Sequence, residues 1–249
     1  MQIIGTNIIS LDETASTNDY LMELLKSGHP AEGTVVITHK QFAGRGLDTN
    51  KWESEPGMNL TFSLLLHPRF LEAEKQCLLS MAISLGIHDL VHSKVSKQPV
   101  TIKWPNDIYI ADRKVCGILI HNSVTANLLD YAVVGIGLNV NQDTFRSDAP
   151  NPVSMKMVTG RDFGLEDLFR QLCKWLDSRY IQLRMGDYKG IREEYLSLLY
   201  RLNEWHIFEI RGKATEARIT GISRYGQLQL DERNGTRNEC DVKEVKFLL

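Results

Sequence analysis

Residues 100–140 read VTIKWPNDIYIADRKVCGILIHNSVTANLLDYAVVGIGLNV and hold four segments rich in β-branched and other apolar residues. The segments lie at 100–104, 108–110, 115–121 and 131–140. Short apolar runs of this composition are typical of buried strands. The polar residues Ala111–Lys114 predict a hairpin turn between the second and the third strand. This run therefore indicates a β-sheet.

Further strands and helices are expected on both sides of this run. Apolar stretches predict strands near residues 7–11, 33–39 and 58–67. Apolar residues spaced three and four positions apart predict helices. We place them after Ser16–Asp19 with a stop at Gly28, and at 75–92, 165–183 and 188–200.

The character of the chain changes after about residue 203. Five short strands are expected in fewer than 50 residues, four of them at 205–210, 214–222, 227–230 and 244–248. Turns with glycine separate them, at Arg211–Gly212, Tyr225–Gly226 and Asn234–Gly235. This spacing favours a small β-barrel appended to an α+β domain.

The composition is that of a globular protein. The chain has 249 residues, of which 43% are apolar and 24% charged, and its net charge is −2. This balance argues against general nucleic-acid binding, and no apolar run reaches the length of a membrane-spanning helix. The four cysteines lie far apart, which favours reduced thiols over a disulfide framework or a zinc site. With no secretory signal in the first residues, these features predict a cytoplasmic protein.

A polar, glycine-rich stretch at residues 40–57 separates two predicted strands without any helix or strand period. Loops of this length are usually functional or disordered. Within it, Gly44 and Gly46 flank Arg45, so backbone N–H groups and a guanidinium can face an anion together. A surface loop with a solvated arginine is the alternative. Because no GxxxxGK[ST] pattern occurs in the chain, any phosphate binding is not of the P-loop kind.

Two neighbouring strand ends carry lysines and oxygen-bearing side chains. In KWPND at 103–107, Lys103 supplies a cation for phosphate, while Asn106 and Asp107 supply oxygen atoms that can serve Mg²⁺ or its waters. Lys114 begins the next apolar strand, where an inward-pointing amine would meet a carboxylate or a phosphate. A solvated lysine at the hairpin turn is the alternative.

Glycines interrupt two of the predicted strands. Gly117 hints at a close backbone approach, because glycine is otherwise unfavourable in a strand. Gly135 and Gly137 alternate, which leaves one face of their strand without side chains as the floor of a flat pocket. Asn139 at the end of this strand serves either a turn or a ligand. No third glycine and no helix signal follow, so this is not a dinucleotide-binding fingerprint.

Ser16, Thr17 and Asn18 precede the first predicted helix. Ser16 with Asp19 three residues later resembles a capping box, which is the default interpretation. The same hydroxyl and amide groups can also bind a small polar ligand.

Taken in order, these segments resemble the biotin protein ligases. The matches are Ser16–Asn18, Gln41–Gly46 with Trp52 following, Lys103–Asp107, Arg113–Gly117 and Gly135–Val140. They span residues 16–140, and the β-rich tail matches the family's C-terminal domain in size and place. Because the chain begins just ahead of the matching region, it resembles the short members without an N-terminal DNA-binding domain.

The resemblance implies an α+β fold in two domains. Residues 1–202 would form the catalytic domain, a mixed, mostly antiparallel sheet with helices on one face. Residues 203–249 would form a small SH3-like β-barrel.

The resemblance also implies a reaction in two steps. Biotin's carboxylate attacks the α-phosphate of MgATP and gives biotinyl-5′-adenylate and pyrophosphate. A lysine of a biotin carboxyl carrier domain then attacks the activated carbonyl and releases AMP. The expected ligands are biotin, ATP and Mg²⁺, and the expected partner is the carrier protein, with no role for nucleic acid or a membrane.

The family pattern assigns roles to individual residues. Those for biotin are Ser16, Thr17, Asn18, Gln41, Arg45, Gly46, Leu47, Lys114, Gly117, Gly135 and Gly137. Those for ATP and the adenylate are Arg45, Trp52, Lys103, Asn106, Lys114 and Asn139, with Asn106 and Asp107 near Mg²⁺. Arg45 and Lys114 are the expected catalytic residues, because their charges offset the repulsion between carboxylate and phosphate. The 40–57 loop is expected to order over the adenylate and exclude water.

One departure concerns the residues after Gly46. Many relatives continue with further arginines, whereas this chain has Leu47-Asp48-Thr49-Asn50-Lys51. Asp48 is adverse near phosphates, although Lys51 compensates in part. We therefore expect weaker retention of the adenylate than an arginine-rich loop gives, and a Leu47→Arg variant should slow adenylate dissociation.

Two other functions stay open at this stage. A lipoate–protein ligase or octanoyl transferase shares the fold and the carrier-lysine chemistry, but its arginine- and glycine-rich signature is not found here. A module that senses biotin or a nucleotide without turnover is the second alternative. A homodimer is compatible with the sequence, which does not decide between monomer and dimer.

Overall fold

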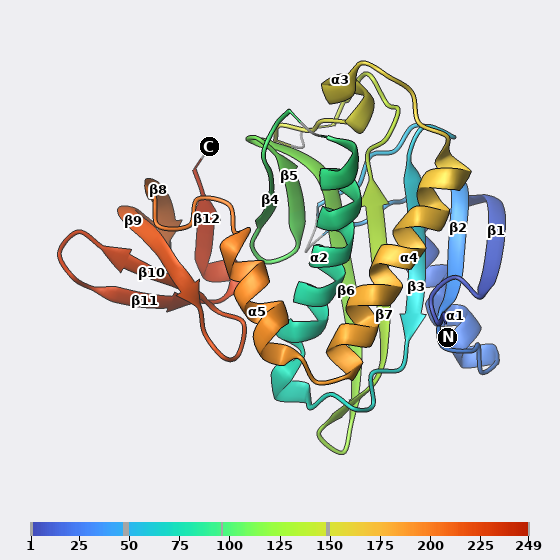
Figure 1. Ribbon diagram of the computed structural model, residues 1–249, viewed down its shortest axis with the longest axis horizontal. Helices are drawn as coiled ribbons and strands as arrows, with labels where there is room; N and C mark the ends of the chain where they lie inside the picture. Colours follow the sequence, from blue (N-terminus) through green and yellow to red (C-terminus); the bar gives the residue numbers. More distant parts are fainter. Residues whose placement is uncertain (1, 47–49, 96, 148–149, 249) are drawn as a thin grey trace.

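The protein contains two β-sheets and five α-helices in the part of the chain that the computed structural model describes, residues 2–46, 50–95, 97–147 and 150–248. Helices pack against the larger sheet, and the smaller sheet forms a separate layer beside α5 (Figure 1). Among these residues no helix has the length and apolar character that crossing a membrane requires.

The larger sheet has seven strands in the order β1-β2-β3-β7-β6-β5-β4. Only β1 and β2 pair in parallel, and each other neighbouring pair is antiparallel. The strands are β1 Asn7–Thr14, β2 Thr34–Gln41, β3 Leu60–Leu66, β4 Val100–Lys103, β5 Asp107–Ile110, β6 Arg113–Thr125 and β7 Leu128–Leu138. The mixed, mostly antiparallel sheet expected from the sequence is confirmed.

Helices cover both faces of this sheet, but not equally. The long helices α2 (Cys77–Lys94) and α4 (Leu165–Arg184) cross the front in Figure 1, with α5 (Tyr188–Ser197) beside them. Helix α1 (Thr17–Ser27) lies on the other face, where Leu21 packs with Val36, Leu65 and Val133. The expectation of helices on one face therefore holds for the long helices, whereas α1 covers part of the opposite face.

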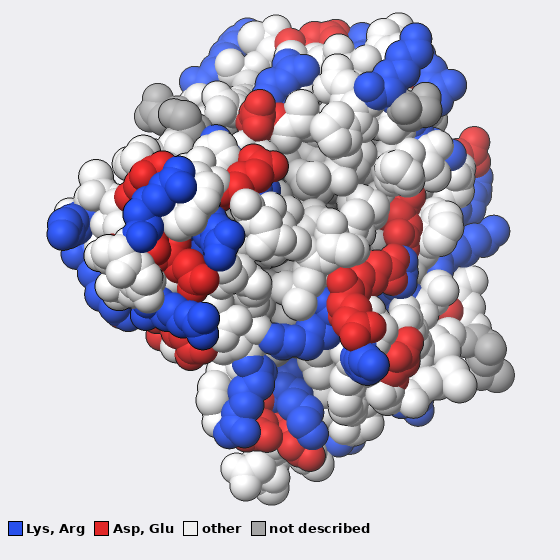
Figure 2. Space-filling model, turned by 60° about the vertical axis from the view of Figure 1, so that its left-hand side comes forward, with Lys and Arg blue, Asp and Glu red and all other residues white. Residues whose placement is uncertain are grey.

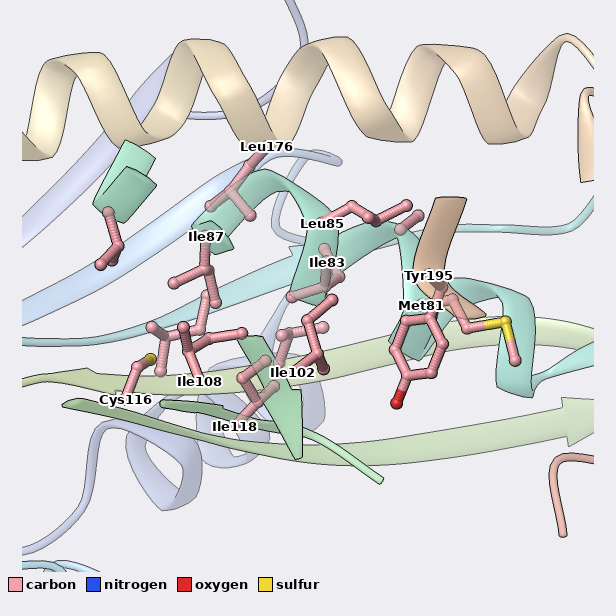
Figure 3. Close-up of a cluster of buried hydrophobic side chains, with 14 of the residues drawn as sticks. Met81, Ile83, Leu85, Ile87, Ile102, Ile108, Cys116, Ile118, Leu176 and Tyr195 are labelled. Atoms are coloured by element: carbon pink, nitrogen blue, oxygen red, sulfur yellow. The ribbon is translucent and has the colours of Figure 1, made fainter. Parts of the chain in front are cut away.

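The main core lies between α2, α4 and the sheet. Figure 3 shows Ile83, Leu85 and Ile87 of α2 between the strands and Leu176 of α4. Because α2 has the sheet on one side and α4 and α5 on the other, it is apolar almost all round. It begins at Cys77 after a 3-10 turn at Ala73–Lys75, two residues later than expected.

The smaller sheet has five antiparallel strands in the order β11-β10-β9-β8-β12. They are β8 Trp205–Ile210, β9 Lys213–Ile222, β10 Leu228–Glu232, β11 Arg237–Cys240 and β12 Val245–Phe247. The expected small β-rich unit is present, and because no pairing joins the edge strands β11 and β12 in the described chain, its sheet is not closed into a barrel. The sequence analysis did not place β11, nor the short helix α3 (Met155–Thr159).

Hydrogen bonds tie the smaller sheet to the rest of the chain. Trp104 Nε1 donates to the carbonyl oxygen of Gly226 at 2.9 Å, and Arg192 of α5 donates to the carbonyls of Ile222 and Ser223.

Basic and acidic side chains are interspersed on the face in Figure 2. Within the smaller sheet, for example, Lys246 pairs with Glu209 at 2.7 Å.

Candidate active site

A cleft of about 1090 Å³ opens on the face of the larger sheet that α1 covers only in part. Its lining comes from the N-terminal end of α1, the 41–53 segment, strands β3 to β7 and the loop after β7. The smaller sheet contributes Val245 and Phe247. Every described residue that the sequence analysis assigned to the site lines this cleft.

The floor of the cleft is made by the glycines of β6 and β7. A Cβ atom on Gly135 would lie 2.5 Å from Asn18 Oδ1, and one on Gly137 would lie 2.2 Å from Trp52 Cε2. At Gly117, a Cβ would lie 3.0 Å from the Trp52 ring and 3.1 Å from Lys114 Nζ. The expected side-chain-free floor is present, and the indole of Trp52 rests on part of it.

A buried polar cluster closes one end of the cleft. The Gln41 Oε1 atom accepts hydrogen bonds from Thr17 N at 2.9 Å and from Thr17 Oγ1 at 3.3 Å. Ser63 Oγ donates to Thr17 Oγ1 at 2.7 Å and lies 2.5 Å from Asn18 Oδ1. Ser16 caps α1, since its Oγ accepts from Asp19 N at 3.3 Å. Ser16 is therefore the helix cap that the sequence predicted, and it lies in the lining of the cleft where a ligand contact was also expected.

The 41–52 segment folds back on itself beside this cluster. Trp52 N donates to the carbonyl oxygen of Gly44 at 3.0 Å, and Gly46 N donates to that of Asn50 at 2.8 Å. The guanidinium of Arg45 is largely exposed and pairs with the carboxylate of Asp19 at 2.9 Å. Arg45 thus stands at the rim of the cleft with its charge partly balanced. The predicted site residue Leu47 lies outside the described residues.

Lys114 lies on the floor next to Trp52. Its Nζ atom is 2.7 Å from Asp107 Oδ1 and 5.7 Å from the centre of the Trp52 ring. Both members of the ion pair are partly buried. The solvated-lysine alternative is therefore excluded in this structure, because the amine points into the cleft.

Lys103 is held by aromatic rings from both sheets. Its Nζ atom donates to Tyr109 OH at 3.2 Å and lies 4.8 Å from the centre of the Phe247 ring. Burial lowers the pKa of Lys103, because desolvation disfavours the charged amine. The neighbouring charge of Asp107 acts in the opposite direction, which keeps part of the amine's affinity for protons.

Two asparagines with amide oxygens line the cleft. Asn106 Nδ2 donates to the carbonyl oxygen of Ile118, and Asn139 Nδ2 donates to that of Val153 at 3.1 Å. Asn139 Oδ1 is buried and has no hydrogen-bond partner in the structure. Together with the Asp107 carboxylate, these are oxygen groups of the kind that Mg²⁺ accepts. Across the described ranges, no group of three or more His, Cys, Asp or Glu side chains is arranged to hold a metal ion by itself.

Several residues in the cleft or buried directly behind its lining were not assigned from the sequence. Ser63 completes the polar cluster, Asp19 pairs with Arg45, and Phe247 packs over Lys103. Ser63 of β3 pairs with Gly135 of β7. Knowledge of this strand pairing would have placed Ser63 beside the glycine floor. Phe247 had no such signal, because its place depends on how the two sheets pack.

Comparison with known proteins identifies the family. The model of the biotin/lipoate A/B protein ligase family matches residues 11–139. The biotin--[acetyl-CoA-carboxylase] ligase of Paracoccus denitrificans is 29% identical over 243 residues, which cover 95% of this chain and 99% of that protein. The bifunctional ligase/repressor BirA of Bacillus subtilis (strain 168) is 30% identical over 187 residues. That match covers 72% of this chain, which spans about half the length of the Bacillus BirA relatives (55%).

The fold is also shared along nearly the whole chain. A structure of biotin protein ligase from Aquifex aeolicus in complex with biotin and ATP superposes with a TM-score of 0.80 and 25% identity. The match covers 98% of this chain and 99% of that one. With the family model matching more than half of the sequence, this chain belongs to the biotin/lipoate A/B protein ligase family.

Proposed function

We propose that the chain is an ATP-dependent biotin protein ligase that forms biotinyl-5′-AMP and transfers biotin to a lysine of a carrier domain. The observation that carries the proposal is the glycine floor between the Thr17–Gln41 polar cluster and the Lys114–Asp107 pair. A flat bicyclic acid fits such a floor, with hydrogen-bonding groups at one end and a cation at the other. Relatives of closely similar length carry the corresponding names.

In the first step, a carboxylate oxygen of biotin forms a bond to the α-phosphorus of ATP. The bond from this phosphorus to the bridging oxygen breaks, and pyrophosphate leaves with the electron pair. Two anions must meet, so nearby cations lower the barrier. Lys114 lies on the floor and Arg45 at the rim, where each can offset this charge.

Both cations are already oriented by ion pairs. Lys114 holds Asp107 and Arg45 holds Asp19, so each carboxylate keeps a cation in place before the substrate arrives. Because a charged group that is already oriented loses little freedom on binding, this arrangement favours the reaction.

Asn106, Asp107 and Asn139 supply oxygen atoms of the kind that would hold a magnesium ion with its waters. The unpartnered Asn139 Oδ1 supports this assignment, because a buried acceptor is otherwise costly. When bound, such an ion neutralises phosphate charge. The protein's own part is to present these oxygens beside Lys103 and Lys114.

In the second step, the uncharged amine of a carrier lysine attacks the acyl carbon of the adenylate. The bond from this carbon to the phosphate oxygen breaks, AMP leaves, and the amine loses a proton as the amide forms. The cleft is open to solvent beside Arg45, so an extended lysine side chain can reach the acyl carbon.

Biotin-dependent exchange between ATP and pyrophosphate tests the proposal, with lipoate and octanoate as parallel substrates. Exchange with biotin alone, followed by biotin transfer to a carrier domain, is the expected result. Exchange with lipoate or octanoate instead would assign the chain to the other branch of its family. Tight biotin binding without exchange would make it a sensor.

A further inference from the structure

Glu53, the residue after Trp52, binds the backbone of the loop that follows β7. Its Oε1 and Oε2 atoms each accept a hydrogen bond from Arg146 N at 3.0 Å, and Oε2 also accepts one from Ser147 N at 2.6 Å. One carboxylate thus joins two segments that are about 90 residues apart in the chain. Both segments line the cleft.

A layer of polar side chains supports this carboxylate from behind. Gln142 Nε2 donates to Glu53 Oε1 at 3.2 Å, and Gln142 Oε1 accepts from Asn59 Nδ2 at 2.6 Å and from Glu55 N at 3.0 Å. Asn59 Oδ1 in turn accepts from Val140 N at 2.9 Å. The exit of β7 is therefore fixed to the segment that follows Trp52.

The far end of the same loop is attached to Lys114. Lys114 N donates to the carbonyl oxygen of Asn151 at 2.8 Å, and Val153 N donates to that of Lys114 at 2.9 Å. In its described residues, the loop is thus attached near Asn139 at one end and to the backbone of Lys114 at the other. Glu53 holds it between these two points.

We propose that Glu53 is a positioning residue that fixes the loop after β7 against Trp52 and so sets how tightly the cleft retains ATP and the adenylate. This inference rests on the proposed function, which puts ATP and the adenylate in this cleft, and on the expectation that Trp52 faces the nucleotide. The polar cluster around Thr17 and Gln41 lies on other elements, so biotin binding should depend on Glu53 much less.

A carboxylate is specifically suited to this position. Burial opposes its ionisation, but the hydrogen bonds from Ser147, Arg146 and Gln142 outweigh this effect and lower the pKa of Glu53. The side chain is therefore an anion at neutral pH and accepts from both backbone N–H groups. A glutamine at this position has one acceptor oxygen, so if that oxygen accepts from Arg146 N and Ser147 N, the amide hydrogens face the Gln142 Nε2 donor instead.

The test compares Glu53→Gln with the matched control Glu55→Gln, whose side chain is exposed two residues away. In pyrophosphate exchange, Glu53→Gln should raise the KM for ATP roughly tenfold, as expected when charge-assisted hydrogen bonds are lost. The KM for biotin should stay within about twofold of its original value, because the hydrogen bonds of the polar cluster around Thr17 and Gln41 are retained. Biotinyl-AMP should also dissociate faster, and amide hydrogen exchange at Arg146 and Ser147 should speed up. Glu55→Gln should match the unmodified chain in all four measurements.

The outcomes separate this inference from the proposed function. Equal ATP KM values for Glu53→Gln and Glu55→Gln, in a chain that exchanges pyrophosphate, would overturn the inference and leave the ligase activity intact. A proportional rise in both KM values with a lower melting temperature would also overturn it, since Glu53 would then act on stability alone. If the unmodified chain shows no exchange, the proposed function fails. Calorimetric ATP affinities of the two variants then decide the role of Glu53, and equal affinities reject it.

Discussion

Lys114 joins three parts of the cleft within a few ångströms. Its amine contacts the Asp107 carboxylate, lies over the Trp52 ring and limits the space above Gly117. Its backbone also pairs with the segment at Asn151–Val153. The backbone of residue 114 is thus placed by hydrogen bonds that do not depend on the charge of its side chain.

We therefore expect Lys114→Ala to remove activity without unfolding the protein. Loss of one cation at the reacting phosphate should slow adenylation roughly 100-fold, or about 3 kcal/mol. The melting temperature should stay close to the original, because the backbone contacts of residue 114 remain. Pyrophosphate exchange and a thermal melt check both points, and near-normal exchange would remove Lys114 from the catalytic residues.

Gly137 makes a second prediction at this scale. In Gly137→Ala the new methyl group would lie 2.2 Å from Trp52 Cε2, so the indole must leave the floor. Exchange should fall roughly tenfold, since overpacking of this kind costs 1–3 kcal/mol. The fluorescence of Trp52, isolated with a Trp52→Phe reference, should change as well.

Gly164→Ala is the matched control for this substitution. Gly164 has φ −68° and its added Cβ would find its nearest neighbour, Asp167 Oδ2, at 3.9 Å. No change in exchange or fluorescence is expected. If both alanine variants behaved alike, close contact between Trp52 and the glycine floor would not matter for activity.

The sequence predicted the site residues better than their partners. Glycine spacing, KWPND and the first-helix serine identified residues whose chemistry is visible in one segment. The ion pairs of Arg45 with Asp19 and Lys114 with Asp107 depend on how distant segments meet. The contact of the Trp52 indole with the glycine floor was likewise not predicted, and its expected place against adenine stays a prediction.

At the scale of elements, Arg179 links three helices. From α4 it donates to Asp89 of α2 at 2.7 and 3.1 Å and to Glu194 of α5 at 2.6 Å. Burial lowers the pKa of Arg179, but the two carboxylates outweigh this effect and raise it. The guanidinium stays charged, and it fixes α5, which carries the connection to the smaller sheet.

Arg179→Met should destabilise the fold by roughly 3 kcal/mol, because it leaves the largely buried Asp89 without its cation. Arg170→Met on the same helix is the control. Arg170 pairs with Glu166 and Asp167 in an exposed position, so its removal should change stability by about 0.5 kcal/mol or less. Denaturant unfolding measures both, and equal effects would contradict the special role of Arg179.

Elements were predicted where their pattern is local. The strands in residues 100–140 and the helices α4 and α5 follow from apolar spacing, and the hairpin at Ala111 was found from its turn residues. β11 was not placed, because Arg237–Cys240 is polar and gains its strand conformation by pairing with β10. The face that α1 covers was also not predictable, since both faces of the central strand β3 are buried.

At the scale of the whole molecule, the folded state should become less stable in acid. Burial opposes ionisation of Asp89, yet its interactions with His88 and Arg179 lower the pKa of this carboxyl. The pKa of Glu53 is also lowered, because its hydrogen bonds outweigh the effect of burial. A carboxyl whose pKa is lower in the folded state stabilises the fold above its unfolded pKa, and this contribution disappears as pH falls through the folded value.

The free energy of unfolding should therefore decrease as the pH drops below about 4, the ordinary range of these carboxyls. Calorimetric melts between neutral pH and pH 3 measure the trend. Asp89→Asn should be less stable than the unmodified chain at neutral pH, and the difference should narrow in acid. A constant difference would show that Asp89 does not contribute through its charge.

The two-part organisation was predicted from the change in character near residue 203, and the boundary at that position remains a prediction. The order of the strands in the smaller sheet and its open edge came only from the structure. The smaller sheet contributes directly to the cleft. Phe247 of β12 packs on Lys103 and forms part of the wall of the proposed nucleotide site.

This wall has a consequence for synthesis of the protein. Strand β12 follows every other described element along the chain, so a nascent polypeptide can fold its larger sheet well before Phe247 has left the ribosome. The biotin end of the cleft would then be complete while the Lys103 side is still open. We expect chains stalled before Phe247 has emerged to bind biotin and to hold ATP poorly, so that competence to activate biotin requires β12 to be in place.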